Sequence, residues 1–130
     1  MVSGRRQEFT LSQMDGVPVV EIKGEVDLYD VEHLEACLQS AAERDAPAVI
    51  VSLRAITYFD SAFMNTLLKF RTHLRTTRRR LLLVKPEMAS AARLLEISGL
   101  SGRLGTFDSV DDALGASGEE LGRTESGKTA

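Results

Sequence analysis

The first half of the chain opens with two short apolar runs that read as a β-hairpin. The runs cover residues 9–13 and 17–22, and in the second of them β-branched residues stand on either side of Pro18. Asp15-Gly16 between them is a pair typical of a tight turn. Pro18 cannot donate a backbone hydrogen bond, so its position predicts an edge strand or the start of a strand.

A helix is expected next. Apolar residues recur at spacings of three and four from Val31 to Ala41, the pattern of an amphipathic helix. Asp30 is the residue type that caps such a helix at its start. We expect the helix to end near Arg44-Asp45.

Two nearly continuous apolar runs follow, Ala48–Leu53 and Leu81–Val84. Runs of this kind are typical of strands buried on both faces, and we place the first in the centre of the sheet. Between them, apolar residues recur at helical spacing from Phe63 to Leu74. This predicts a helix that begins near Ala62 and ends near Thr76.

The last third of the chain predicts two more helices and a short strand. The first helix covers Met88 to Ile97, and Gly99 is suited to end it in a left-handed conformation, with Leu100 folding back as an apolar contact. A strand at 104–107 and a helix at 110–114 follow. From Ala116 onward Gly, Ser, Thr and charged residues replace the apolar pattern, which predicts a disordered tail over 116–130.

Strands that alternate with helices indicate an α/β fold. We therefore predict a single domain over residues 8–115, with a mixed central sheet of about five strands and about four helices. A chain of 130 residues with 43% hydrophobic content is enough for one core and leaves no room for a second domain of ordinary size.

Charge and cysteine content narrow the class of protein. Sixteen basic and 19 acidic residues give a net charge of -3, too weak a field to attract nucleic acid or an anionic membrane. The lone Cys37 cannot form an internal disulfide, and its place on the apolar side of a predicted helix indicates core packing in a reducing compartment. No apolar run follows the polar start with its Arg5-Arg6 pair, so neither a signal peptide nor a membrane span is expected. We expect a cytoplasmic protein without direct nucleic-acid or membrane contact.

Asp60 and Ser61 lie between a predicted buried strand and a predicted helix. A helix N-terminus has unpaired N–H groups and the positive end of the helix dipole, so it favours an anionic group such as a phosphate. Ser61 is therefore a candidate for a switch residue. The simpler interpretation is a helix cap, because Asp and Ser are preferred at that position and need no further purpose.

Three patches give the chain a resemblance to a known family. They are Gly24-Glu25-Val26-Asp27, Phe59-Asp60-Ser61 and the segment Leu94 to Leu100, in that order and on successive predicted elements. Over about residues 8 to 115 the chain resembles the STAS domain, and within it the bacterial anti-sigma factor antagonists.

The resemblance implies a partner-switching regulator of transcription. The unphosphorylated protein would bind an anti-sigma factor that is also a serine protein kinase, and phosphorylation of Ser61 would break the complex. Carried over by position, Ser61 is the phosphoacceptor, and the partner-binding residues are Glu25, Asp27, Asp60, Ser61, Ala62 and Phe63. A phosphate adds up to about two negative charges, which a surface shaped for a neutral hydroxyl would reject. The resemblance implies no cofactor, no metal and no enzymatic activity, and it leaves a homodimer open.

One departure from the family stands next to the site. The family usually follows the serine with a small or hydroxyl residue and then glycine, whereas this chain has Ala62 and Phe63. Either the partner-binding surface has changed or Phe63 turns inward. The alternative function is a non-phosphorylated STAS-like scaffold or an interaction subunit of a transport system.

Three other motifs carry little weight. Residues 122–129 match the P-loop pattern in letters, but no buried strand precedes them and no helix follows, so a nucleotide-binding domain is the weakest of the three functions. His33 and His73 lie on predicted helices without a metal-ligand or catalytic pattern. The basic residues from Arg75 to Arg80 have no interleaved aromatics, and we interpret them as the cations that favour a helix C-terminus.

Overall fold

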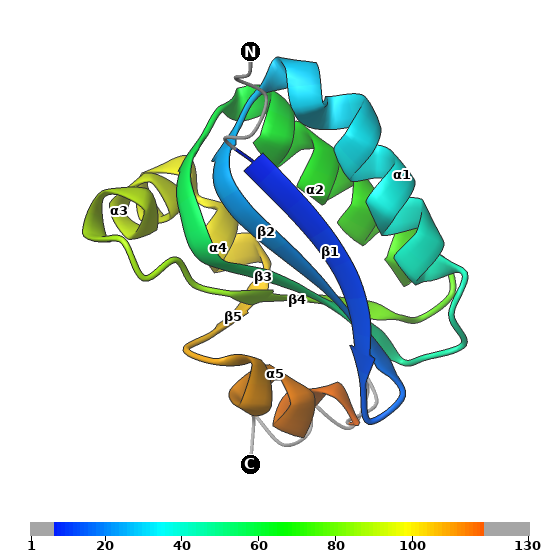
Figure 1. The fold of residues 1–130 in the computed structure, drawn as a ribbon. Helices are drawn as coiled ribbons and strands as arrows, with labels where there is room; N and C mark the ends of the chain where they lie inside the picture. Colours follow the sequence, from blue (N-terminus) through cyan, green and yellow to red (C-terminus); the bar gives the residue numbers. More distant parts are fainter. Residues whose placement is uncertain (1–6, 119–130) are drawn as a thin grey trace.

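Five strands form one mixed sheet in a computed structural model that describes residues 7–118 (Figure 1). The strands are β1 (Gln7–Met14), β2 (Val17–Val26), β3 (Ala48–Phe59), β4 (Arg80–Val84) and β5 (Gly105–Phe107). They lie side by side in chain order, with β1 antiparallel to β2 and each later strand parallel to the one before. The predicted α/β fold with a mixed five-stranded sheet is confirmed, and β3 is its central strand.

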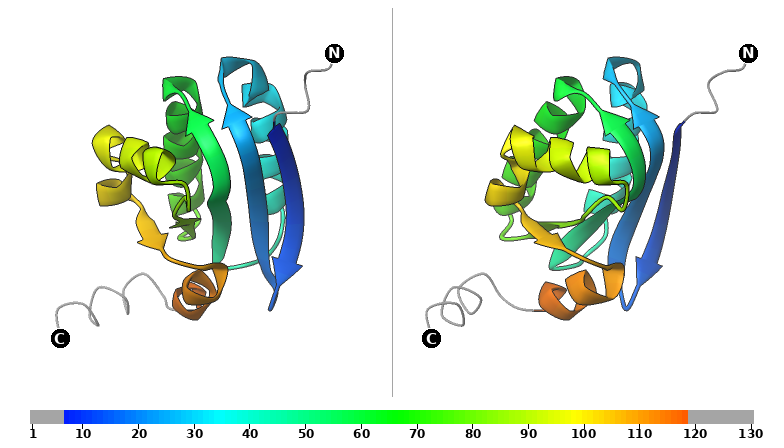
Figure 2. Two further views of the ribbon diagram at one scale, coloured as in Figure 1. Left: turned by 60° about the vertical axis from the view of Figure 1, so that its left-hand side comes forward. Right: turned by 90° about the vertical axis from the view of Figure 1, so that its left-hand side faces the viewer.

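The described residues form five α-helices and one 3₁₀ turn. These are the 3₁₀ turn (Leu28–Asp30), α1 (Val31–Ala42), α2 (Ser61–Arg75), α3 (Ala89–Ser98), α4 (Leu100–Arg103) and α5 (Val110–Ser117). The four longer helices are those that the sequence predicts, and α4 adds a single turn. Figure 2 shows α1 and α2 together on one face of the sheet, with α5 near the end that carries the β1-β2 hairpin.

The sheet separates the core into two apolar clusters, one on each of its faces. The larger lies where α1 and α2 cover the sheet, and it includes Val20, Val51 and Leu83 from neighbouring strands. The smaller lies where α5 covers the opposite face, around Ile50 and Ala113. Alternate residues of the same buried strands therefore supply both clusters, which explains why their sequences are apolar without a break.

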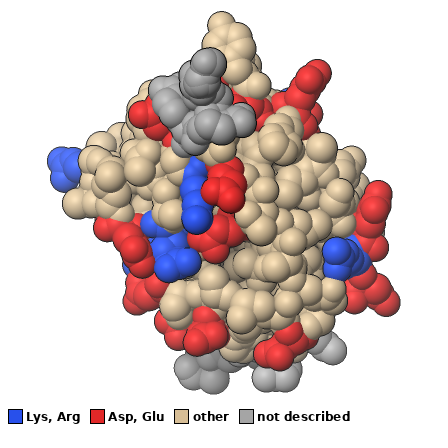
Figure 3. Space-filling view, in the orientation of Figure 1, with Lys and Arg blue, Asp and Glu red and all other residues tan. Residues whose placement is uncertain are grey.

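The face opposite α1 and α2 is polar beyond α5. The Arg54 guanidinium lies 3.6 Å from a Glu21 carboxylate oxygen and 4.0 Å from Glu87, and the buried Ser52 hydroxyl donates to Glu21 at 3.3 Å. Figure 3, in the same view as Figure 1, shows acidic and basic side chains interspersed over this part of the surface. A surface of alternating sign gives no single-sign field for a polyanion.

Pro18 is the second residue of β2, so the interpretation as a strand start is correct and that as an edge strand is wrong. β2 pairs with strands on both sides. Its parallel ladder with β3 begins only at Val19, opposite Ile50, so the proline precedes that ladder. The chain thus places the residue that lacks an N–H where β3 has not yet begun to pair.

The basic residues from Arg75 to Arg80 interact with helix C-termini, as predicted, but two of them interact with helices other than α2. Arg75 is in the last turn of α2, as predicted. Arg79 Nη1 donates to the carbonyl oxygens of Ala42 (2.8 Å) and Arg44 (3.2 Å), at the end of α1. Arg80 Nη1 donates to the Ala116 carbonyl in α5 (3.0 Å). These three bonds satisfy carbonyls at or just beyond helix C-termini, where the helix leaves such groups without an internal partner.

The C-terminal part follows the predicted elements closely. Gly99 ends α3 with a φ of 81°, the left-handed conformation expected of it, and Leu100 is buried. α5 continues to Ser117, so Ala116 and Ser117 are helical. The prediction that the disordered tail begins at Ala116 is therefore wrong for these two residues, and residues 119–130, which include the P-loop-like residues 122–129, lie outside the described residues.

Cys37 packs against the larger core, and burial raises the pKa of its thiol. Because the folded state holds the proton more tightly, the unfolded chain ionises first as the pH rises, and this thiol's contribution to stability is lost towards alkaline pH. We expect iodoacetamide to alkylate Cys37 at pH 8 more slowly in the folded protein than in urea, because the thiolate is the nucleophile. Equal rates, measured by intact mass, would contradict this placement.

Candidate functional site

The first two family-like patches meet at the carboxyl ends of two parallel strands. Glu25 of β2 is opposite Tyr58 of β3, and Val26 is opposite Phe59. Both strands therefore end at the same edge of the sheet, and the loops that follow them begin side by side. The 3₁₀ turn follows β2, and α2 follows β3. Residues more than 30 positions apart in the chain are brought to one place by strand pairing alone.

Asp27 and Asp30 build the turn after β2. The Tyr29 N–H donates to Asp27 Oδ1 (3.0 Å), and the Asp27 N–H donates to Asp30 Oδ2 (2.9 Å). This reciprocal pair is a capping box around the 3₁₀ turn. The prediction that Asp30 caps α1 is wrong in this respect, because its side chain makes no capping bond to that helix. The carboxylate is instead held by the backbone of Asp27, three residues earlier.

Asp60 joins the two loops through both oxygens of its carboxylate. Oδ1 accepts the N–H of Phe63 (3.1 Å), which caps the start of α2. Oδ2 accepts the N–H of Leu28 (3.0 Å), which belongs to the 3₁₀ turn. The predicted partner-binding residue Asp60 is therefore a structural cap and a tie between the loops, and both oxygens have backbone partners.

Ser61 is the first residue of α2, and its side chain is exposed. No hydrogen bond involves its hydroxyl within residues 7–118, since the cap of the helix is the Asp60 side chain. The simple capping interpretation therefore accounts for Asp60 but leaves Ser61 without a role in the fold. An exposed hydroxyl beside the first N–H groups of a helix is chemically suited to carry a phosphate.

Phe63 turns inward, the second of the two alternatives that the sequence left open. Its side chain is fully buried, and its ring centroid lies 5.3 Å from that of Phe59. The prediction that Phe63 belongs to the partner-binding surface is therefore wrong, because this side chain offers no surface to a partner. Ala62 is half-buried, and it is the small residue that borders Ser61. The aromatic ring that breaks the family pattern leaves the serine uncovered.

The other predicted residues divide between surface and core. Glu25 is exposed and Asp27 is half-buried at the same edge of the sheet as Asp60. In the third patch, Leu95 and Leu100 belong to the larger core. That patch therefore owes its pattern largely to packing, and only the first two patches meet at Ser61 through contacts that the structure defines.

Three exposed apolar residues at this edge were missed by the sequence patterns. Leu28 is 63% exposed, Tyr29 is 91% exposed and Tyr58 is 50% exposed. The 3₁₀ turn contributes the first two, and the end of β3 contributes the third. The one available signal was two large apolar residues enclosed by Asp27 and Asp30 in a turn, where side chains face solvent.

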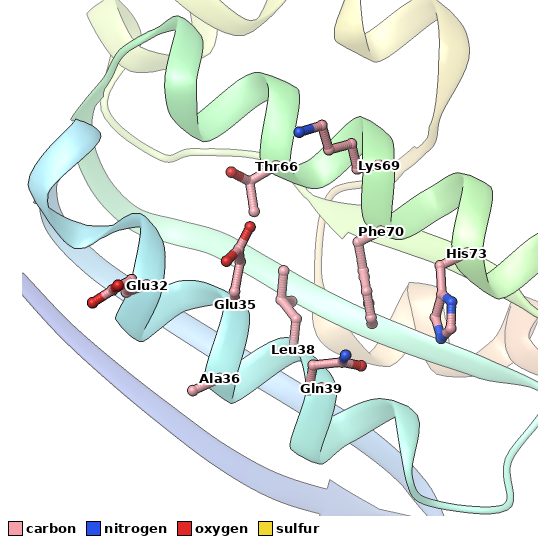
Figure 4. Close-up of a pocket in the computed structure, with 9 residues that line it drawn as sticks. All are labelled: Glu32, Glu35, Ala36, Leu38, Gln39, Thr66, Lys69, Phe70 and His73. Carbon is pink, nitrogen blue, oxygen red and sulfur yellow. The ribbon is translucent and has the colours of Figure 1, made fainter.

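A groove of about 530 Å³ runs between α1 and α2 (Figure 4). Leu38 and Phe70 lie deep in it, Glu32 and Glu35 come from α1, and Lys69 comes from α2. α2 contains three Lys or Arg residues and no acidic residue, whereas α1 contains two acidic residues and no Lys or Arg. No ion pair joins the two walls within the described residues. The groove is shallow and its apolar floor is largely buried, which is unlike an enclosed ligand cavity.

The two histidines have ordinary surface environments. His33 is exposed and meets Phe9 edge to face, with ring centroids 4.7 Å apart. His73 stacks on Phe70 at 6.4 Å. Among residues 7–118, no three His, Cys, Asp or Glu side chains gather as a metal ion would require. In the same range, none of the helices combines the length and the apolar character that crossing a membrane requires.

The comparison with protein families decides the classification. A model of the STAS domain matches residues 8–113, most of the chain. The chain belongs to the STAS domain family. No curated protein sequence matches it. The family membership agrees with the order of the three patches in the sequence.

Solved structures share the fold of this STAS domain. An anti-sigma factor antagonist from Mycobacterium paratuberculosis is 22% identical, with a TM-score of 0.77, over 92% of this chain and 100% of that one. The anti-sigma factor antagonist SpoIIAA in its unphosphorylated form is 20% identical, with a TM-score of 0.68, over 82% of this chain and 93% of that one. A sulfate transporter family protein from Wolinella succinogenes is 24% identical, with a TM-score of 0.66, over 82% of this chain and 88% of that one. The fold thus occurs in proteins named as anti-sigma factor antagonists and in one named as a sulfate transporter family protein.

Proposed function

We propose that this STAS domain is an anti-sigma factor antagonist that works by partner switching. In its unphosphorylated form it binds an anti-sigma factor, a serine protein kinase, in the cytoplasm of a bacterium. Phosphorylation of Ser61 releases that partner. The protein acts by binding and needs no cofactor or catalytic residue of its own.

One observation carries the proposal. Ser61 has an exposed hydroxyl that no part of the described fold uses, next to a loop that Asp60 ties to the other family-like patch. An exposed residue without a structural role at the junction of two loops is suited to modification. The solved structures of similar fold include SpoIIAA in its unphosphorylated and phosphorylated forms.

The chemistry of release follows from the surroundings of Ser61. Both oxygens of the Asp60 carboxylate already accept backbone N–H groups, and a carboxylate offers the new phosphate no hydrogen-bond donor. A phosphate of up to about two charges would have to lose water to remain inside a protein contact. The cost of that desolvation, together with the added volume, favours the separated state.

The second candidate is a STAS interaction subunit of a transport system. The fold similarity to the sulfate transporter family protein supports it. Such a subunit needs no phosphoacceptor, so its binding would be the same with or without phosphate on Ser61. The response to phosphorylation therefore separates the two candidates.

The test is to incubate the full chain with ATP and each anti-sigma factor kinase of the same genome, followed by intact and peptide mass spectrometry. We expect one phosphate on Ser61 and none on Ser61→Ala, which keeps the Asp60 cap. The phosphorylated chain should bind the kinase at least about tenfold more weakly, since a buried charge with no partner costs more than about 1.4 kcal/mol. Phosphate elsewhere, or equal binding of both forms, would exclude the switch.

A further inference from the structure

The 3₁₀ turn presents two large apolar side chains to solvent at the edge of the sheet where Ser61 lies. Leu28 is 63% exposed and Tyr29 is 91% exposed. We call this pair the Leu28-Tyr29 tip. A 91% exposed tyrosine makes almost no contact with its own fold, so packing does not explain its presence. Aromatic side chains with little intramolecular contact are the type most often found at the centre of binding interfaces.

The backbone of the tip is held in place before any partner arrives. The Leu28 N–H donates to Asp60 (3.0 Å), and the Tyr29 N–H donates to Asp27 (3.0 Å). The N–H of Asp30 donates to the Asp27 carbonyl (2.9 Å) and closes the turn. A docking element that is already ordered loses little conformational entropy on binding, and tyrosine has only two side-chain torsions to fix.

The charge around the tip indicates what kind of surface it fits. Residues 24–35 contain five acidic residues and no Lys or Arg: Glu25, Asp27, Asp30, Glu32 and Glu35. The tip therefore stands in an acidic part of the chain. A complementary surface would have an apolar pocket for the aromatic ring and Lys or Arg residues around its rim.

We infer that the Leu28-Tyr29 tip inserts into an apolar pocket with a basic rim on the anti-sigma factor, and that Tyr29 is the principal hot spot of this contact. This rests on the proposed function, because it names the contact by which the same partner is held. The tip and Ser61 contact the partner side by side, since Asp60 bonds to both loops. The tip holds the complex together, and the phosphate on Ser61 opens it.

The test uses the purified anti-sigma factor kinase that binds the wild-type chain, with calorimetry as the readout. We expect Tyr29→Ala to weaken binding by about tenfold to a hundredfold and Tyr29→Phe to stay within about threefold, because the ring fills the pocket. Met14→Ala is the matched control. Met14 is also exposed (42%), but it ends β1 opposite Val17, so the whole length of β2, about 30 Å, separates it from the tip. Association should also slow as salt is raised.

The outcomes separate the two proposals. If the wild-type chain binds the kinase and Tyr29→Ala binds it as tightly, the inference about the tip is wrong, while the proposed partner-switching function stands. If no anti-sigma factor binds the wild-type chain, the proposed function is wrong, and so is the inference about the tip that rests on it. If Tyr29→Ala changes only self-association in sedimentation, the tip belongs to a contact between two copies and the inference is wrong. The melting temperature of each variant shows whether a loss of folding explains the result.

Discussion

Replacing Phe63 by alanine should lower the free energy of unfolding by about 3–5 kcal/mol, the usual cost of removing a buried phenyl ring. The side chain is fully buried and packs against Phe59 with ring centroids 5.3 Å apart. Its loss leaves a cavity between the end of β3 and the first turn of α2, where the backbone is fixed by the Asp60 cap and cannot easily close. Urea denaturation followed by circular dichroism measures the change.

Asn65→Ala is the matched control on the same helix. Asn65 is exposed two positions further along α2, and the substitution should change stability by less than about 0.5 kcal/mol. A cost below about 1 kcal/mol for Phe63→Ala would mean that the ring is at the surface and available to a partner. The experiment therefore also decides which of the two sequence alternatives for Phe63 is correct in solution.

Asp60→Ala should be destabilising by about 2 kcal/mol, since it removes the cap of α2 and the bond to Leu28 together. The cap accounts for most of this, because the Leu28 N–H is exposed and water replaces its partner. The variant should also loosen the 3₁₀ turn. We expect faster hydrogen exchange at the amides of Leu28 and Phe63 than in wild type.

Two substitutions isolate the cause. Glu35→Ala removes an exposed carboxylate with no such bonds, so it should change stability by less than about 0.5 kcal/mol. Ser61→Ala removes the hydroxyl beside the cap and should be equally mild. If Ser61→Ala proved as costly as Asp60→Ala, the serine would have a structural role, and the argument for a free phosphoacceptor would be lost.

Local periodicity predicted most of the fold because burial follows it directly. Phe63 to Leu74 recur at helical spacing, and the structure buries that stripe in α2. The continuous apolar run Ala48–Leu53 predicted a central strand, but β3 continues to Phe59. In the extension, Ala55, Ile56, Tyr58 and Phe59 pair with β2 through register shifts, and the pattern of a single strand carries no information about such pairing.

Interactions between distant residues were beyond the sequence patterns. Arg79 and Arg80 donate to carbonyls 37 and 36 positions away, on α1 and α5, and nothing near them in the chain indicates those targets. Asp60 was correctly placed at the start of a helix, but its second bond, to Leu28, depends on the meeting of β2 and β3. Asp27 and Asp30 could have been assigned to a capping box from their spacing of three residues.

The two bonds of the Asp60 carboxylate set a rule for redesigning this protein. A chimera could receive only the loop after β2 from a relative, or only the start of α2. The N–H at position 28 and the side chain at position 60 would then come from different proteins, and the bond between them would no longer be matched. Segments 25–30 and 58–63 should therefore be exchanged as one unit. In such transplants recognition and control would be inherited together, because the same side chain supports the turn that we propose as the partner contact and the helix that begins at Ser61.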